Sequence, residues 1–226
     1  MLTLKYKAYF MENKQQLDQI SDIKKMMDKA SRFSSISSWS VILAGIFALL
    51  GAFLIYSDLE FFLDDGKLIS YSDLIKGDSG EDLTRKIKFL LVIGTLIFLS
   101  SIVVCYLLSA RKVKLENVEF WNPTFKRAVW ALFLPLLAGG VFSLILIYHN
   151  AIGMVAPTTL VFYGLGLINA SKYTFGEVEV LGYVELILGL ISSYFMGMGL
   201  LFWAIGFGLC HIVFGIVLYV KHDRKV

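Results

Sequence analysis

The chain has 226 residues, of which 57% are hydrophobic and 17% are charged, and it carries a formal net charge of +3. A soluble domain typically has about 45–50% apolar and about 25% charged residues, so this composition indicates a polytopic membrane protein. The charge is too small to indicate nucleic-acid binding. The two cysteines lie in apolar runs and indicate neither a disulfide framework nor a zinc site.

The N-terminal segment, residues 1–38, is expected on the cytoplasmic side. Apolar residues recur every three or four positions within residues 12–34, at Leu17, Ile20, Ile23, Met27 and Ala30. This spacing, with lysines and acids between, predicts a short amphipathic helix. Such a helix can lie on the inner leaflet, contact a cytoplasmic protein partner or a second copy of the chain, or simply extend the first span.

Six apolar stretches follow, each close to the roughly 20 residues that a spanning helix needs. They are Trp39–Tyr56, Phe89–Ala110, Ala128–Tyr148, Ala151–Ala170, Val178–Phe195 and Leu200–Val220. The last two are separated only by Met196–Gly199, and a single helix of that length would exceed the ~30 Å hydrocarbon core, so a tight hairpin is expected. Pro135 and Pro157 can kink the third and fourth spans. The sequence therefore predicts an all-α bundle of six transmembrane helices over residues 39–220.

The distribution of basic residues predicts the orientation. With an even number of spans, sixteen of the 21 Lys and Arg residues fall on the side that carries the termini. They lie in the N-terminal segment, in the inner loop of residues 111–127, at Lys172 and in the tail of residues 221–226. The other five lie in the acidic outer loop of residues 57–88. Because Lys and Arg concentrate on the cytoplasmic side, we expect a protein of the cell (inner) membrane with both termini cytoplasmic.

Ionisable residues inside a span are costly to bury, so each is a candidate for function. Two lie deep, Glu185 in the fifth predicted span and His211 in the sixth. From the helical rise, Glu185 is about 9 Å and His211 about 14 Å from the inner ends of their spans, so the hairpin lets them meet in the inner half of the membrane. The pair can be a proton-responsive site, a polar clamp between helices, or two groups that do not touch. Four further polar residues can enlarge such a site: Tyr163 and Asn169 in the fourth span, and Ser192 and Ser193 in the fifth.

Small residues at four-residue spacing predict close helix contacts. They are Ala44, Ala48 and Ala52 in the first span, Gly189, Ser193 and Gly197 at the end of the fifth, and Ala204 and Gly208 in the sixth. A six-helix bundle can use such ridges internally. They therefore permit a homo-oligomer without requiring one.

No cofactor is expected. A bis-histidine haem needs two histidines at matching depth, whereas His149 falls at the outer edge and His211 much deeper. No phosphate-binding loop, metalloprotease helix or nucleophile elbow occurs. We therefore expect a transporter- or channel-like protein with a polar site between the last helices, rather than an enzyme. The alternatives are a membrane sensor or adaptor that acts through residues 12–34 and a cytoplasmic partner, and a lipid-modifying enzyme that uses the same pocket.

Overall fold

The structure is a computed structural model, and it describes Gln19 and residues 36–59, 80–116, 121–195 and 197–224. The predicted amphipathic helix of residues 12–34 and most of the outer loop, residues 60–79, lie outside the described residues. Within the described ranges the chain is helical and contains no strand. The prediction of an all-α protein is therefore confirmed for this part of the chain.

Long helices make up most of the described residues. In chain order they are α2 (Ser38–Leu59), α4 (Gly80–Glu116), α5 (Pro123–Tyr148), the 3₁₀ turn η1 (Ile152–Met154), α6 (Val155–Ser171) and α7 (Gly176–Tyr194). The chain then forms one continuous helical stretch, Gly199–Asp223, which we call the last helix. It consists of α8 (Gly199–Trp203), the π-helical segment η2 (Ala204–Cys210), α9 (His211–Leu218) and the π-helical turn η3 (Tyr219–Asp223).

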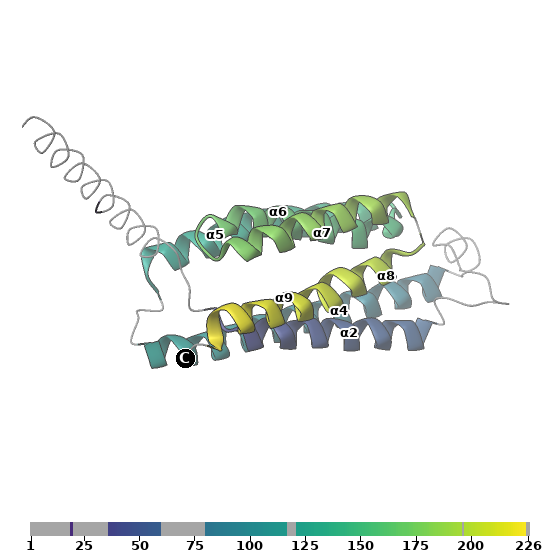
Figure 1. Ribbon diagram of the computed structural model, residues 1–226. Coiled ribbons are helices and arrows are strands. Elements are labelled where there is room, and N and C mark those ends of the chain that lie inside the picture. The colour runs from purple at the N-terminus through teal and green to yellow at the C-terminus, as the bar shows by residue number, and fades with distance from the viewer. Residues whose placement is uncertain (1–18, 20–35, 60–79, 117–120, 196, 225–226) are drawn as a thin grey trace, which may run out of the picture.

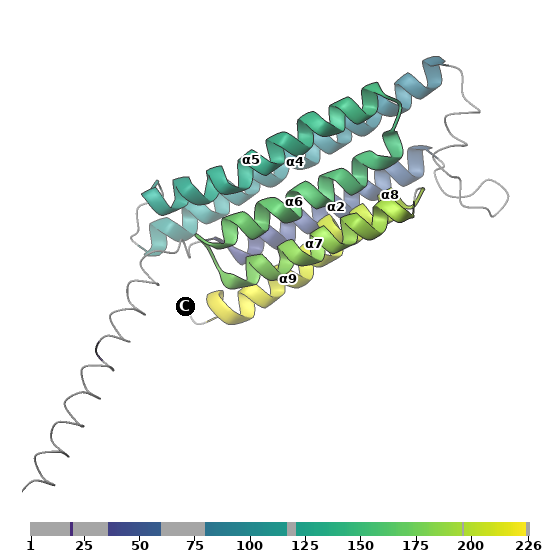
Figure 2. The ribbon, with the colours of Figure 1, turned by 90° about the horizontal axis from the view of Figure 1, so that it is seen from above.

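The helices form two layers, which Figures 1 and 2 show from two directions. One layer contains α5, α6 and α7, with α6 in the middle, and the other contains α4, α2 and the last helix, with α2 in the middle. The layers meet where α6 and α7 contact the last helix. Because the last helix packs against α2 on one side and against α6 and α7 on the other, it connects the two layers.

Five helical stretches are long and apolar enough to cross a membrane. They are Ser38–Ser57, Ile87–Leu115, Pro123–Tyr148, Ile152–Ser171 and Gly199–Asp223. They correspond to the first four predicted spans and to the sixth. The fifth predicted span corresponds to α7, which is not among the five, since it carries three glutamates, Glu177, Glu179 and Glu185, within 19 residues. The structure therefore supports a membrane bundle with five such helices.

The two prolines have different places in their helices. Pro135 lies inside α5, which continues over 26 residues. Pro157 is the third residue of α6, where backbone N–H groups have no acceptor within the helix, so the missing donor costs no helical hydrogen bond. The 3₁₀ turn η1 precedes it, and the fourth predicted span is thus a short 3₁₀ turn followed by a regular helix.

The inner loop predicted at residues 111–127 is shorter than expected, because α4 continues to Glu116 and α5 already begins at Pro123. The side chain of Asn122 accepts a hydrogen bond of 2.7 Å from the backbone N–H of Phe125. An Asn cap followed by Pro at the first helical position is a strong start signal for a helix. This signal lay within the sequence and fixes where α5 begins.

Two residues with positive φ lie in the turns that reverse the chain. Asn150 has a φ of 58° between α5 and η1, and Gly197 has a φ of 105° between α7 and the last helix. A φ of this size strains any residue that carries a Cβ. The sequence assigned Gly197 to helix packing, whereas the structure uses it in the turn.

The other small residues lie at or near helix contacts. Ala48 and Ala52 are buried, and Ala44 is half-buried on the same helix. Ala204 packs against the cluster of Ala52, Ile55 and Leu200, Gly208 faces Leu49, and Gly189 faces Val161. The closest approach of α6 and α7 uses a pair that the sequence did not single out: a Cβ on Gly164 would lie 2.6 Å from the carbonyl oxygen of Gly182.

Ion pairs hold one end of the bundle, which we call the basic end. Lys112 at the end of α4 contacts Asp223 of the last helix at 2.6 Å, and the other oxygen of Asp223 accepts a hydrogen bond of 3.1 Å from the backbone N–H of Ser38. Lys221 pairs with Glu177 of α7 at 3.0 Å. Partial burial alone would raise the pKa of Glu177, but hydrogen bonds from its own backbone N–H and from Lys221 hold that pKa below its usual value. These contacts link both layers to the end of the last helix.

Candidate functional site

Glu185 and His211 lie at the centres of two antiparallel helices. Glu185 is nine residues from each end of α7, and His211 is twelve residues from each end of the last helix. At about 1.5 Å per residue, the two positions lie roughly 13 Å and 18 Å from the ends of their helices. The sequence-based bounds put both residues in the inner half of their spans. The observed helices extend further at the basic end, and both residues are therefore central.

The carboxyl of Glu185 is enclosed by the bundle and lies beside His211. Its side chain is fully buried, and Oε1 is 3.4 Å from Nδ1 of His211. Among the described residues, neither carboxyl oxygen has a hydrogen-bond partner. Residue spacing explains the burial, because the inward face of α7 repeats every three or four positions at Leu181, Gly182, Glu185, Gly189 and Ser192. A charge buried in this way lacks the hydrogen bonds that normally offset its desolvation.

His211 is held by two hydrogen bonds that define its tautomer. Nδ1 is 3.0 Å from the carbonyl oxygen of Gly206, and Nε2 is 2.8 Å from the hydroxyl of Tyr163. A neutral ring with its proton on Nδ1 satisfies both contacts, since Nδ1–H donates to Gly206 and Nε2 accepts from the Tyr163 hydroxyl. The ring also stacks on Tyr163 and on Phe207, with centroid distances of 5.4 Å and 5.9 Å. The imidazole therefore has a fixed position between α6 and α7.

Gly206 brings the backbone of the last helix directly against Glu185. A Cβ at this position would collide with Oε2 of Glu185 and would lie 2.7 Å from Cδ2 of Leu160, a fully buried residue. Gly206 belongs to the π-helical segment η2, which ends immediately before His211. Single π-helical turns occur frequently at functional sites. A backbone segment and an apolar side chain thus lie close to Oε2 of the carboxyl.

The remaining predicted site residues lie elsewhere. Asn169 donates a hydrogen bond of 3.0 Å to the carbonyl oxygen of Ala131 and accepts one from Lys172, so it joins α6 to α5. The Ser193 hydroxyl donates to its own helix, at the carbonyl oxygen of Leu190. Its neighbour Ser192 is fully buried on the face of α7 that carries Glu185, and its hydroxyl has no partner among the described residues. The structure therefore brings together Glu185, His211 and Tyr163, but not Asn169 or Ser193.

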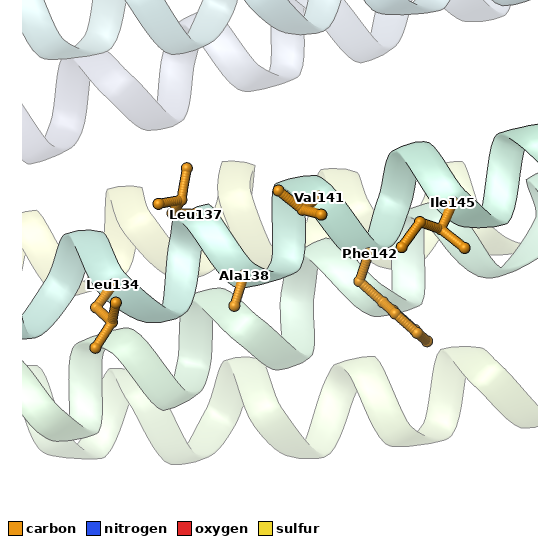
Figure 3. Close-up of a pocket in the computed structure, with 6 residues that line it drawn as sticks. All are labelled: Leu134, Leu137, Ala138, Val141, Phe142 and Ile145. Carbon is orange, nitrogen blue, oxygen red and sulfur yellow. The ribbon is translucent and has the colours of Figure 1, made fainter.

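A shallow pocket of about 400 Å³ lies on α5, and Figure 3 shows its six lining residues. They are Leu134, Leu137, Ala138, Val141, Phe142 and Ile145. All six are apolar and belong to α5, whereas Glu185 and His211 belong to α7 and the last helix. The pocket is therefore not part of the polar site, and it offers no group for acid–base chemistry or for ion binding.

The described residues contain no group of three His, Cys, Asp or Glu placed to hold a metal ion. In comparisons with protein-family models, with curated proteins and with solved structures, nothing matches the chain. The class of the protein therefore rests on its own structure. Five helices that are long and apolar enough to cross a bilayer, packed into one bundle, define an integral membrane protein.

Proposed function

We propose that the protein is a transporter- or channel-like membrane protein whose working site is the cluster of Glu185, His211 and Tyr163. One observation carries this proposal: the buried carboxyl at the centre of α7 has no hydrogen-bond partner among the described residues and faces an imidazole at 3.4 Å. Ionisable groups inside a membrane bundle are expensive and mark ion or substrate pathways. A residue retained only to clamp two helices together would be expected to use its oxygens in hydrogen bonds.

The proposal includes α7 as a sixth span. Its 19 residues correspond to about 28 Å, close to the thickness of the hydrocarbon core. Two of its three acids, Glu177 and Glu179, belong to the first turn, at the basic end. The third, Glu185, is fully buried and is therefore not exposed to lipid. The position of the three acids, rather than their number, supports a spanning helix.

We further propose that the basic end of the bundle faces the cytoplasm. This end carries the basic residues of the α4–α5 connection, the α6–α7 connection and the end of the last helix. Within the described ranges they are Arg111, Lys112, Lys114, Lys126, Arg127, Lys172, Lys221 and Arg224. The opposite end has Arg85, Lys86 and Lys88 in the same ranges. The excess at one end agrees with the positive-inside rule and, with six spans, supports a cytoplasmic location of both termini.

Reconstitution into liposomes tests the transport function. A potassium diffusion potential is applied, and dyes inside the liposomes report the entry of H⁺ or Na⁺, with a K⁺ gradient examined separately. We expect flux above that of empty liposomes, loss of this flux in Glu185→Gln, and wild-type flux in Glu179→Gln, whose carboxyl is exposed on the same helix. Wild-type flux in a folded Glu185→Gln protein would refute the proposal, as would the absence of any flux in the wild type.

A further inference from the structure

Building on the proposed transport function, we propose that the species bound at this site is a proton shared by Glu185 and His211, and that the site does not take a metal cation. Three features of the site support this: the carboxyl has few oxygen ligands around it, the two side chains are separated by a short path, and hydrogen bonds hold the imidazole in place.

A metal cation would find too few ligands. Hard cations such as Ca²⁺ and Mg²⁺ bind about six to eight oxygen atoms. At Glu185, the backbone of Gly206 lies against Oε2 with Leu160 beside it, and the imidazole of His211 lies near Oε1. The carbonyl oxygen of Gly206 already accepts from His211. One carboxylate surrounded by backbone, a leucine and an imidazole is a poor metal site.

A proton needs neither this space nor these ligands. With one added proton the pair has two arrangements: a carboxylic acid beside a neutral imidazole, or a carboxylate beside an imidazolium. Conversion of the second into the first breaks the Nδ1–H bond of His211 and forms an O–H bond at Oε1 of Glu185, while the bonding electron pair stays on Nδ1. The neutral ring that results carries its proton on Nε2, so its Nδ1 no longer donates to Gly206. The net charge of the pair is zero in both arrangements. The proton therefore moves without creating an unpaired charge in the bundle.

The geometry places the two atoms just outside hydrogen-bond distance. Oε1 and Nδ1 are 3.4 Å apart, and a charge-assisted N–H···O bond of about 2.7–2.9 Å forms when they approach by roughly 0.5–0.7 Å. On the far side of the ring, Nε2–H donates to the Tyr163 hydroxyl both in the imidazolium and in the neutral ring left by the transfer, whereas the hydroxyl donates to Nε2 when the neutral ring carries its proton on Nδ1. Both protonation states of His211 thus keep a hydrogen bond to Tyr163.

The other titratable groups around the pair are Tyr163 of α6 and Cys210 of the last helix, both of which interact electrostatically with Glu185. Cys105 of α4 interacts with Tyr163 in the same way. Among the described residues no Lys or Arg is paired with Glu185. The imidazole is therefore the group that can exchange a proton with the carboxyl directly.

Infrared difference spectroscopy of the purified protein tests the proton directly and requires no transport. Spectra are recorded from mildly acidic to mildly alkaline buffer, with Na⁺ or K⁺ as the only metal cation. We expect a protonated-carboxyl band whose intensity changes with pH, which is absent from Glu185→Gln and retained in Glu179→Gln. A Glu185 band that is constant or missing over the whole range would overturn the proposal, as would carboxylate bands that shift when Na⁺ replaces K⁺.

A second measurement follows the protonation of His211, the partner of Glu185. The chain has three histidines, so the His149→Gln, His222→Gln protein leaves His211 as its only imidazole. Nitrogen-15 spectra of this protein should show the protonation state of the ring changing over the same pH interval as the carboxyl band, because interacting sites titrate as a pair. A ring that titrates in the same way with and without Glu185→Gln would overturn the shared proton.

The results separate this inference from the transport function. Proton binding at the pair without flux in liposomes would refute the transport function and leave the proton site intact. Flux of Na⁺ or K⁺ that depends on Glu185, without any change of the carboxyl band with pH, would support the transport function. It would overturn the inference that the bound species is a proton. Both proposals stand only if the band and a proton flux disappear together in Glu185→Gln.

Discussion

The contact between Gly206 and Glu185 gives the sharpest test of the site. In Gly206→Ala the new methyl group would collide with Oε2 of Glu185 and would lie 2.7 Å from Cδ2 of Leu160. Carbon atoms in contact are normally about 3.5–4.0 Å apart, so Leu160 or the last helix must move by roughly 1 Å. Leu160 and Glu185 are both fully buried, so neither has open space to enter.

We expect Gly206→Ala to lower the free energy of unfolding by about 1–3 kcal/mol, the usual cost of an extra methyl group in a packed core. For a chain of this size the loss corresponds to a melting temperature lower by roughly 2–12 °C. Thermal unfolding of the purified protein, followed by the fluorescence of its four tryptophans, measures it. Gly140→Ala is the matched control, because a Cβ there meets nothing within 4 Å and a gain of up to about 1 kcal/mol is expected.

A double variant isolates the contact itself. Glu185→Asp shortens the side chain and withdraws the carboxyl from the new methyl group. In Gly206→Ala, Glu185→Asp the combined loss should therefore be smaller than the sum of the single losses, by about 0.5–3 kcal/mol for groups in contact. Strict additivity, or a Gly206→Ala protein as stable as the Gly140→Ala control, would mean that the last helix does not pack against the carboxyl.

Three further variants test the surroundings of the site by thermal unfolding. Tyr163→Phe removes the hydroxyl 2.8 Å from the imidazole and should lower the free energy of unfolding by about 1–3 kcal/mol, because a buried nitrogen loses its hydrogen-bond partner. Tyr183→Phe removes an exposed hydroxyl and should change the stability very little. Equal losses in the two variants would contradict the hydrogen bond between Tyr163 and His211. Lys112→Met removes the ion pair with Asp223, whose atoms are 2.6 Å apart, and should lower the free energy of unfolding by about 1.5–3 kcal/mol. Lys221→Met removes a more exposed ion pair and should lower it by only about 0–1 kcal/mol. The reverse order would refute the role of the Lys112–Asp223 pair in holding the basic end. Gly182→Ala places a methyl group 2.9 Å from the backbone of α6 and should lower the free energy of unfolding by about 1–3 kcal/mol. An unchanged melting temperature would mean that α6 and α7 lie further apart.

The length and polarity of local segments were enough to predict the helices. An apolar run of about 20 residues must satisfy its backbone within a helix if it lies in lipid, whatever its neighbours are. Five of the six predicted spans correspond to helices that meet this requirement. The remaining one, the fifth predicted span, corresponds to α7 and contains three glutamates. Only their positions, two in the first turn and one facing inward, make it compatible with a span.

The sequence also singled out Glu185 and His211, since an ionisable residue in an apolar run stands out without a structure. It also named Tyr163, which contacts His211, but it did not decide which of the other polar candidates face the pair. Ser192 rather than Ser193 lies on the face of α7 that carries Glu185, because one residue rotates the side chain by about 100° around a helix. Asn169, equally polar, is directed to α5 instead. Polarity identifies candidates, and helix rotation decides which of them meet.

What the sequence alone determined is therefore local: which stretches form apolar helices, and which ionisable groups lie inside them. Only the tertiary structure decided that Glu185 and His211 are in contact at the centres of their helices, and that Gly206 leaves room for the carboxyl. The physical reason is that these contacts join segments whose relative rotation and depth depend on packing across the whole bundle. The π-helical segment before His211 changes that rotation, and no residue pattern in the sequence predicted it.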